Sequence, residues 1–143
     1  AGPREQPPMR VDGSTLGVSI CFEDVFSREI LRAFPEAHLL VNLSNDAWFG
    51  NSTAPHQHLQ IAQMRAQETE RVVIRSTNTG VSAFIDHKGR VMAQTRQFAT
   101  ESITEVLQGR SGVTPFYYFG RLQGWLAVLP FVVVVVLSRR KAG

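Results

Sequence analysis

The chain has 143 residues, a formal net charge of +3 and 43% hydrophobic residues. Residues 1–120 hold all 12 acidic residues and 11 of the 15 basic ones, so the excess positive charge belongs to residues 121–143. This distribution argues against nucleic-acid binding, which needs a basic surface across the folded part, and the apolar content excludes disorder. The single cysteine, Cys21, excludes an intrachain disulfide and a cysteine-cluster zinc site.

Hydrophobic periodicity changes along the first half of the chain. Leu16, Val18 and Ile20 alternate as in a strand, whereas apolar residues every four positions after Cys21 indicate a short helix that Pro35 ends. A continuous apolar run then indicates a buried parallel strand. The predicted elements are a strand over 16–21, a helix over 26–34, a strand over 39–43, a loop over 44–53 and a helix over 55–71.

The sequence after residue 71 predicts an antiparallel meander. Residues with high β propensity fill three segments, 72–77, 81–85 and 91–95, which are joined by turns that contain Gly. Residues 102–107 are a candidate for a fourth strand. In the helix before them, Leu59, Ala62, Ala66 and Thr69 share one face. The order strand, helix, strand, helix and meander predicts an α/β layered domain with a mixed sheet.

Cys21 stands where the first long strand ends and a helix begins. At such an elbow a nucleophile is presented at the carboxyl edge of the sheet, and the amide of Phe22 can stabilise an oxyanion. Glu23 is close enough to assist proton transfer or orient a partner, although Glu23 and Asp24 also suit a helix start electrostatically. The alternative for Cys21 is a small core residue.

The loop after the second strand carries exposed aromatic residues. It should lie at the same sheet edge as Cys21, because open α/β sheets bind ligands at the carboxyl ends of their strands. Trp48 and Phe49 suggest an apolar ligand or a membrane surface, or else a loop that folds back on the core. We name Trp48, Phe49 and Asn45 as candidate substrate-binding residues.

Two groups of polar residues in the long helix have plainer interpretations. His56 and His58, with Asp46, suggest a metal site, but a His-x-His pair on a helix points its rings about 200° apart. We therefore expect solvated or capping histidines and no metal. The i, i+3 spacing of Arg65, Glu68 and Arg71 is typical of a solvated ion-pair face.

The last 23 residues predict a transmembrane helix. Residues 122–138 form an uncharged stretch of 17 residues, which as a helix covers about 25 Å of a hydrocarbon core of about 30 Å. A buried strand or helix is the alternative, but Pro130 lies inside the run and the basic cluster Arg139 to Lys141 follows it. That cluster predicts a cytoplasmic C-terminus, with residues 1–120 on the periplasmic side of the inner membrane of a bacterium.

Three motifs in this order resemble the nitrilase (carbon–nitrogen hydrolase) superfamily. Within it, the match is to the bacterial branch that N-acylates apolipoproteins, and it covers nearly the whole chain. The motifs are Ile20-Cys21-Phe22-Glu23-Asp24, Asn42-Leu43-Ser44-Asn45-Asp46-Ala47-Trp48-Phe49-Gly50 and Arg75-Ser76-Thr77-Asn78-Thr79-Gly80.

This resemblance implies an αββα sandwich and a Glu-Lys-Cys triad without metal or cofactor. Cys21 matches the nucleophile, which takes an acyl chain from a phospholipid as a thioester and passes it to the diacylglyceryl-cysteine at an apolipoprotein N-terminus. Glu23 matches a supporting glutamate, and Phe22 stands where relatives have Tyr. The resemblance also implies a membrane protein, and we expect a monomer.

The triad is incomplete within this sequence. Its Glu and Lys should precede Cys21 by more than the chain provides, and neither Lys88 nor Lys141 fits a catalytic site. We therefore expect a C-terminal fragment, inactive alone, with residues 1–120 as part of the catalytic domain and residues 121–143 as the membrane helix. The rival interpretations are a membrane-anchored amide hydrolase of the nitrilase type and a non-enzymatic membrane-anchored domain.

Overall fold

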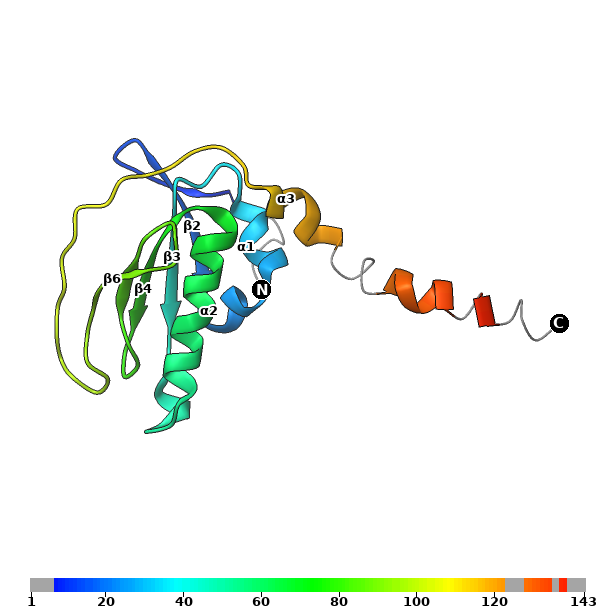
Figure 1. Ribbon diagram of the computed structural model, residues 1–143. Helices are drawn as coiled ribbons and strands as arrows, with labels where there is room; N and C mark the ends of the chain where they lie inside the picture. Colours follow the sequence, from blue (N-terminus) through cyan, green and yellow to red (C-terminus); the bar gives the residue numbers. More distant parts are fainter. Residues whose placement is uncertain (1–6, 123–127, 135–136, 139–143) are drawn as a thin grey trace.

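The computed structural model describes residues 7–122, 128–134 and 137–138. Six strands form one mixed sheet in which the spatial order equals the chain order (Figure 1). The central pairs β2–β3 and β3–β4 are parallel, and the other pairs are antiparallel. The strands are β1 (Met9–Val11), β2 (Ser14–Ile20), β3 (Leu39–Ser44), β4 (Val72–Thr77), β5 (Ala83–Ile85) and β6 (Val91–Gln94).

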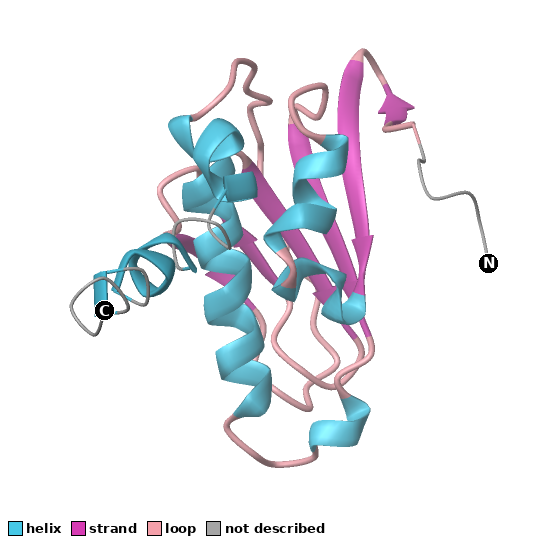
Figure 2. Cartoon of the chain, turned by 90° about the vertical axis from the view of Figure 1, so that its right-hand side faces the viewer, coloured by secondary structure: helices cyan, strands magenta, loops and turns pink. Residues whose placement is uncertain are grey.

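Helices α1 (Ser27–Ala33) and α2 (Ala54–Thr69) lie on one face of this sheet (Figure 2). The helix and parallel-strand predictions are confirmed, because α1 ends directly before Phe34-Pro35 and α2 begins beside Pro55. The predicted face of α2 is buried, and the core between the helices and the sheet contains Ile30, Leu40, Leu59, Ala62, Ala66, Val73, Val81, Ala83 and Ile85. The mixed α/β architecture is therefore the one the sequence predicts.

The other face of the sheet carries apolar side chains that remain exposed. In β2 the small residues Gly17 and Ser19 face the helices, whereas Val18 and Ile20 lie on the opposite face and are 42% and 54% exposed. Leu43 of β3 is 46% exposed on that face. Strands in half-buried antiparallel sheets normally place polar residues outward, so this pattern is typical of a sheet that packs against a second layer.

The prediction of a strand over 102–107 is wrong. These residues are irregular and pair with no strand among the described residues. They belong to a long connection that passes the β6 edge and returns to the short helix α3 (Pro115–Phe119) (Figure 1). The connection is fixed at its end, where Arg71 Nη2 donates to Gly112 O at 2.6 Å and Thr114 Oγ1 donates to Glu68 O at 2.6 Å.

The predicted transmembrane segment falls partly outside the described residues. Residues 128–134 and 137–138 are helical, whereas 123–127, 135–136 and the basic cluster within 139–143 lie outside the description. No helix among the described residues has both the length and the apolar character to cross a bilayer. The transmembrane helix and its orientation stay predictions.

Gly17 allows close contact between β2 and the helical layer. A Cβ at this position would lie 2.9 Å from Ala33 Cβ and 2.9 Å from Leu40 Cδ2, which is closer than packed carbon atoms approach. We predict that Gly17→Ala lowers the free energy of unfolding by about 1 to 3 kcal/mol through overpacking. Urea denaturation monitored by circular dichroism measures this, and a stabilised variant, as the reduced entropy of the unfolded chain alone would give, would contradict it.

Candidate active site

Cys21 occupies a sharp elbow between strand and helix. β2 ends at Ile20, and the 3₁₀ helix η1 (Cys21–Val25) begins at once. Cys21 has a φ of 52°, which lies in the left-handed region that residues with a side chain rarely adopt. Glu23 Oε2 accepts a hydrogen bond from Ile20 N at 2.7 Å, so the glutamate closes the turn around the thiol. The predicted elbow is confirmed.

The adjacent strand β3 places two polar side chains directly behind the cysteine. Asn42 Nδ2 donates to Cys21 O at 3.1 Å, and Ser44 Oγ lies 3.5 Å from Cys21 Sγ. Both residues are buried, and they reach the cysteine because β2 and β3 are parallel neighbours with Ile20 opposite Leu43. The parallel pairing thus brings the end of β3 against the elbow.

Four charged or titratable side chains form a buried cluster beneath the elbow. Arg75 Nη2 lies 2.9 Å from Asp46 Oδ2, and Arg75 Nη1 donates to Asn42 Oδ1 at 3.0 Å. His58 lies between two carboxylates, with Nε2 2.8 Å from Asp24 Oδ1 and Nδ1 3.2 Å from Asp46 Oδ1. Each of the four residues is 1% or 2% exposed. We call Asp24, Asp46, His58 and Arg75 the buried cluster.

The buried cluster is held by opposite charges and hydrogen bonds. Isolated charges are very costly to bury, and a buried ion pair is tolerated only when its remaining polar atoms find partners. Asp46 meets this condition well: in addition to Arg75 and His58, its Oδ1 accepts from Ser44 Oγ at 2.7 Å, and its backbone N donates to Asn78 Oδ1 at 3.1 Å. The cluster therefore fixes the ends of β3 and β4, η1 and the start of α2 around Cys21.

The expectation that His58 is solvated or capping is wrong. Asp24 lies in the first turn of η1, as its helix-start interpretation expects, and it also pairs with His58. His56 is exposed, as predicted, but the rotation of about 200° between the two positions places His58 on the buried side of α2. There its ring also lies 5.3 Å from the Phe22 ring. No group of three or more potential metal ligands is found among the described residues.

The prediction of a solvated ion-pair face on α2 is also wrong. Arg65 does pair with Glu68 at 2.9 Å, but Arg65 is 6% exposed and also donates to Ser27 Oγ of α1. Burial lowers the pKa of Arg65, against the opposing effects of Glu68 and Asp24, and burial raises the pKa of Glu68. This pair therefore joins the two helices rather than facing solvent.

Arg71 is buried for a different reason. Its guanidinium donates to Ala37 O at 2.7 Å and to Thr69 O at 3.2 Å, and it lies 4.7 Å above the Phe34 ring. Desolvation lowers its pKa, and the nearby charge of Arg110 adds to this effect. Arg71 thus ties the ends of α1 and α2 together, away from Cys21.

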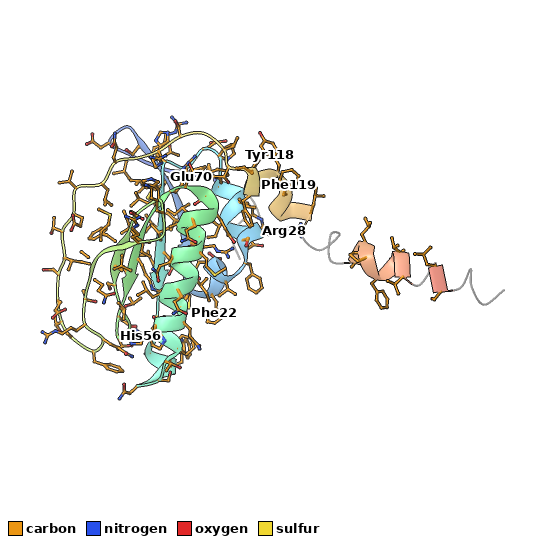
Figure 3. All side chains as sticks on the ribbon, in the orientation of Figure 1. Phe22, Arg28, His56, Glu70, Tyr118 and Phe119 are labelled. Carbon is orange, nitrogen blue, oxygen red and sulfur yellow. The ribbon has the colours of Figure 1, made fainter. Side chains whose placement is uncertain are left out.

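The loop after β3 carries Trp48 and Phe49 at the sheet edge where the elbow lies. Trp48 is 79% exposed, and its Nε1 donates to Asn45 O at 2.7 Å. Phe49 is half-buried, with its ring 6.1 Å from the Phe22 ring, and Figure 3 shows Phe22 beside the N-terminal half of α2. Asn45 Oδ1 accepts from Ala47 N and from Asn78 Nδ2, so its side chain shapes the loop. The structure brings all six predicted site residues to one sheet edge.

Glu23 provides a direct test of the elbow. We predict that Glu23→Ala slows alkylation of Cys21 by iodoacetamide about tenfold or more. The backbone N–H of Ile20 loses its charged acceptor, so the turn that presents the sulfur is no longer closed. Glu23→Gln keeps an acceptor oxygen and should stay within about threefold of the parent. The exposed Glu36→Ala serves as a control for loss of a carboxylate. Equal rates for all three variants would show that Glu23 does not hold the elbow.

Comparison with protein families gives one match over most of the chain. The family described as "Carbon-nitrogen hydrolase" matches residues 1–115. This range includes Cys21, the buried cluster and the loop with Trp48.

Curated relatives match over the same region and beyond. The chain is 52% identical over 119 residues to "Apolipoprotein N-acyltransferase" of Nitrosomonas europaea, covering 83% of this chain and 24% of the relative. It is 43% identical over 143 residues to the protein of the same name from Methylococcus capsulatus, covering 99% of this chain and 28% of the relative. The chain therefore spans about a quarter of the length of these relatives.

Solved structures share the fold at low sequence identity. Nit3 of Saccharomyces cerevisiae, described as a member of branch 10 of the nitrilase superfamily, matches with a TM-score of 0.58 and 18% identity, over 68% of this chain and 38% of that one. The C. elegans NitFhit protein matches with a TM-score of 0.56 and 23% identity, over 68% of this chain and 26% of that one. These likenesses support the nitrilase-like α/β fold.

Proposed function

Since this chain belongs to the carbon–nitrogen hydrolase family, we propose that it is the nucleophile-bearing part of an apolipoprotein N-acyltransferase. The enzyme moves a fatty acyl chain from a phospholipid, through a thioester on Cys21, to the amino group of a diacylglyceryl-cysteine at an apolipoprotein N-terminus. The observation that carries the proposal is the position of the chain's single cysteine at a left-handed elbow, within a region 52% identical to a protein of that name.

In this proposal Cys21 attacks the ester carbonyl of the phospholipid. The sulfur forms a bond to the carbonyl carbon, the oxyanion is stabilised by the Phe22 backbone N–H, and collapse releases the lipid alcohol. The amine of the acceptor then attacks the thioester carbonyl, the bond between carbon and sulfur breaks, and the amine gives up one proton, which regenerates the thiol as the amide forms. Glu23, which accepts from Ile20 N at 2.7 Å, maintains the turn that presents the sulfur.

The base that takes the thiol proton and the cation that favours the thiolate come, in this proposal, from a Glu and a Lys outside this chain. The position of Lys88 supports this assignment. Lys88 lies in the turn between β5 and β6, not at the edge of the sheet where Cys21 lies. The exposed apolar face of β2 and β3 supports the αββα arrangement, in which a second sheet covers it. One active site would then be built from both layers.

The lipid substrates explain the exposed aromatic residues. Trp48 is 79% exposed. Exposure of its large apolar ring to water is unfavourable, whereas contact of the ring with acyl chains is favourable. Together with Phe49 and Asn45 it forms the proposed substrate-binding loop. We further propose that residues 121–143 span the inner membrane with a cytoplasmic C-terminus, which brings Cys21 to the periplasmic surface. The enzyme works as a monomer without a cofactor.

The experiment uses the full-length protein that contains this chain. A phospholipid radiolabelled in its acyl chain is added first, and hydroxylamine-sensitive label is mapped to a peptide. We expect label on Cys21 and, after a diacylglyceryl-cysteine peptide is added, its transfer to the amino group in ping-pong kinetics. Label released as free fatty acid despite the acceptor would instead identify an amide-hydrolase-like enzyme, and absence of label on Cys21 would refute the proposal.

A further inference from the structure

Ser44 is the hydroxyl residue nearest to the proposed nucleophile among the contacts of the described residues. Its Oγ lies 3.5 Å from Cys21 Sγ and 2.7 Å from Asp46 Oδ1. The side chain is 9% exposed and stands at the last position of β3. Because the strand fixes its backbone and β3 packs between β2 and β4, the hydroxyl is held between sulfur and carboxylate.

A serine hydroxyl carries one proton and two lone pairs, so Ser44 can donate to only one of its two neighbours at a time. When Cys21 is a thiol, Ser44 donates to Asp46 and its oxygen accepts from the S–H group. When the sulfur is a thiolate, the hydroxyl proton can turn to the sulfur. The same side chain therefore satisfies both states of the cysteine without movement of the backbone.

Asp46 can give up this hydrogen bond because the Arg75 guanidinium still donates to it. Arg75 Nη2 remains 2.9 Å from Oδ2, and His58 Nδ1 remains 3.2 Å from Oδ1. Arg75 in turn donates to Asn42, and His58 is held from its other nitrogen by Asp24 at 2.8 Å. The buried cluster thus keeps the carboxylate in place whichever way the Ser44 hydroxyl points.

We infer that Ser44 is a catalytic residue of the reaction at Cys21, whose hydroxyl donates to the sulfur when the sulfur carries negative charge, and that Asp46 is its positioning residue. This inference rests on the proposed function. The thiolate occurs twice in the cycle, before attack on the phospholipid and when the thioester collapses to the amide. Ser44 transfers no proton in either step; it only redirects its hydrogen bond, so atoms and charges balance without it.

The inferred role predicts a loss in both half-reactions. Hydrogen bonds to charged groups correspond to factors of about 10 to 100, so Ser44→Ala should slow acylation of Cys21 and transfer to the acceptor by about this amount. The charged and titratable groups that face this position are Asp46, with His58 and Arg75 behind it, and Glu23 at the elbow. Ser44→Ala removes a donor to the thiolate, so the pH profile of Cys21 alkylation should move to higher pH. The other groups facing this position are unchanged in the variant, so the shift reports the lost hydroxyl alone.

The test compares three variants in the full-length protein with iodoacetamide and with radiolabelled phospholipid. Ser44→Ala is the test, and Ser44→Thr keeps a hydroxyl. Thr69→Val is the control for loss of a buried hydroxyl, because Thr69 is 1% exposed and its Oγ1 donates to Arg65 O at 2.7 Å, at the end of α2 away from Cys21. Thermal unfolding checks that all three fold. We expect Ser44→Ala to lose rate and shift the alkylation profile, Ser44→Thr to recover most of the rate, and Thr69→Val to resemble the parent.

The possible outcomes separate this inference from the proposed function. Equal losses in Ser44→Ala and Thr69→Val, or an unchanged alkylation profile in Ser44→Ala, would overturn the role of Ser44. A Cys21→Ala variant measured alongside tests the proposed function itself. If Cys21→Ala is inactive while Ser44→Ala matches the parent, only the inference fails; if Cys21→Ala remains active, the proposed function fails.

Discussion

Replacing Arg75 with methionine should lower the free energy of unfolding of the chain by about 3 to 5 kcal/mol, the range for breaking a buried ion pair by removing one partner. Arg75 is 1% exposed, and its guanidinium lies 2.9 Å from Asp46 and 3.6 Å from Asp24. Methionine fills a similar volume, so the loss comes from two carboxylates left buried without their main cation. Urea denaturation of the variant and the parent measures the difference.

Two further variants identify the cause of this loss. Arg90→Met changes an exposed arginine and should stay within about 0.5 kcal/mol of the parent. Adding Asp46→Asn to Arg75→Met removes one of the unpaired buried charges. The double variant should therefore lose less free energy of unfolding than the sum of the losses of the two single variants. A loss below about 1 kcal/mol for Arg75→Met would show that solvent reaches the buried cluster and that its charges are not held in a dry interior.

The elements of the fold are predictable because their hydrophobic periods are local. The four-residue spacing that ends at Pro35 is α1, and the run beside Pro55 is α2. The parallel pairing of β2, β3 and β4 follows from the intervening helices. The strand proposed over 102–107 fails because strand formation also requires a partner edge, which its residue types do not specify.

The buried cluster is not predictable from spacing. Arginine is a mostly exposed residue type, so the i, i+3 spacing of Arg65 and Glu68 suggests a solvated face, and the 200° between His56 and His58 suggests that they share no site. The burial of His58 and Arg65 depends on partners from other elements: Asp24 of η1 for His58 and Ser27 of α1 for Arg65. One signal was present: His58 directly precedes Leu59 and lies four residues before Ala62, on the same face of α2 as these apolar residues.

The elbow and the buried cluster have one physical explanation. Holding Cys21 at a φ of 52° costs about 1 to 3 kcal/mol, and such strain persists only where surrounding structure determines it. Glu23 and Asn42 fix the backbone on either side of the cysteine, and Asp46 and Arg75 fix Asn42 and Ser44 from below. A site built this way presents its sulfur without rearrangement, as a nucleophile requires.

Replacing Cys21 with serine should reduce acyl transfer by the full-length protein about 10³-fold or more. The oxygen of serine is nearly isosteric with sulfur, so the elbow and the contacts of Ser44 remain. A serine hydroxyl is a much weaker acid than a thiol, however, and needs an adjacent general base to become a nucleophile. The proposed Glu base of the full-length protein suits the acidity of a thiol, whereas a carboxylate is too weak a base to activate a serine hydroxyl to the same extent.

Stability and labelling make this result specific to chemistry. Cys21 is half-buried, so Cys21→Ser should change the free energy of unfolding by less than about 1 kcal/mol, unlike the Arg75 variant. Because the chain has a single cysteine, iodoacetamide should modify the parent within residues 1–143 only at Cys21 and leave the same region of Cys21→Ser unmodified. A Cys21→Ser protein that keeps more than about a tenth of its activity would mean that the thioester is not formed at this position and that the strained elbow serves the fold instead.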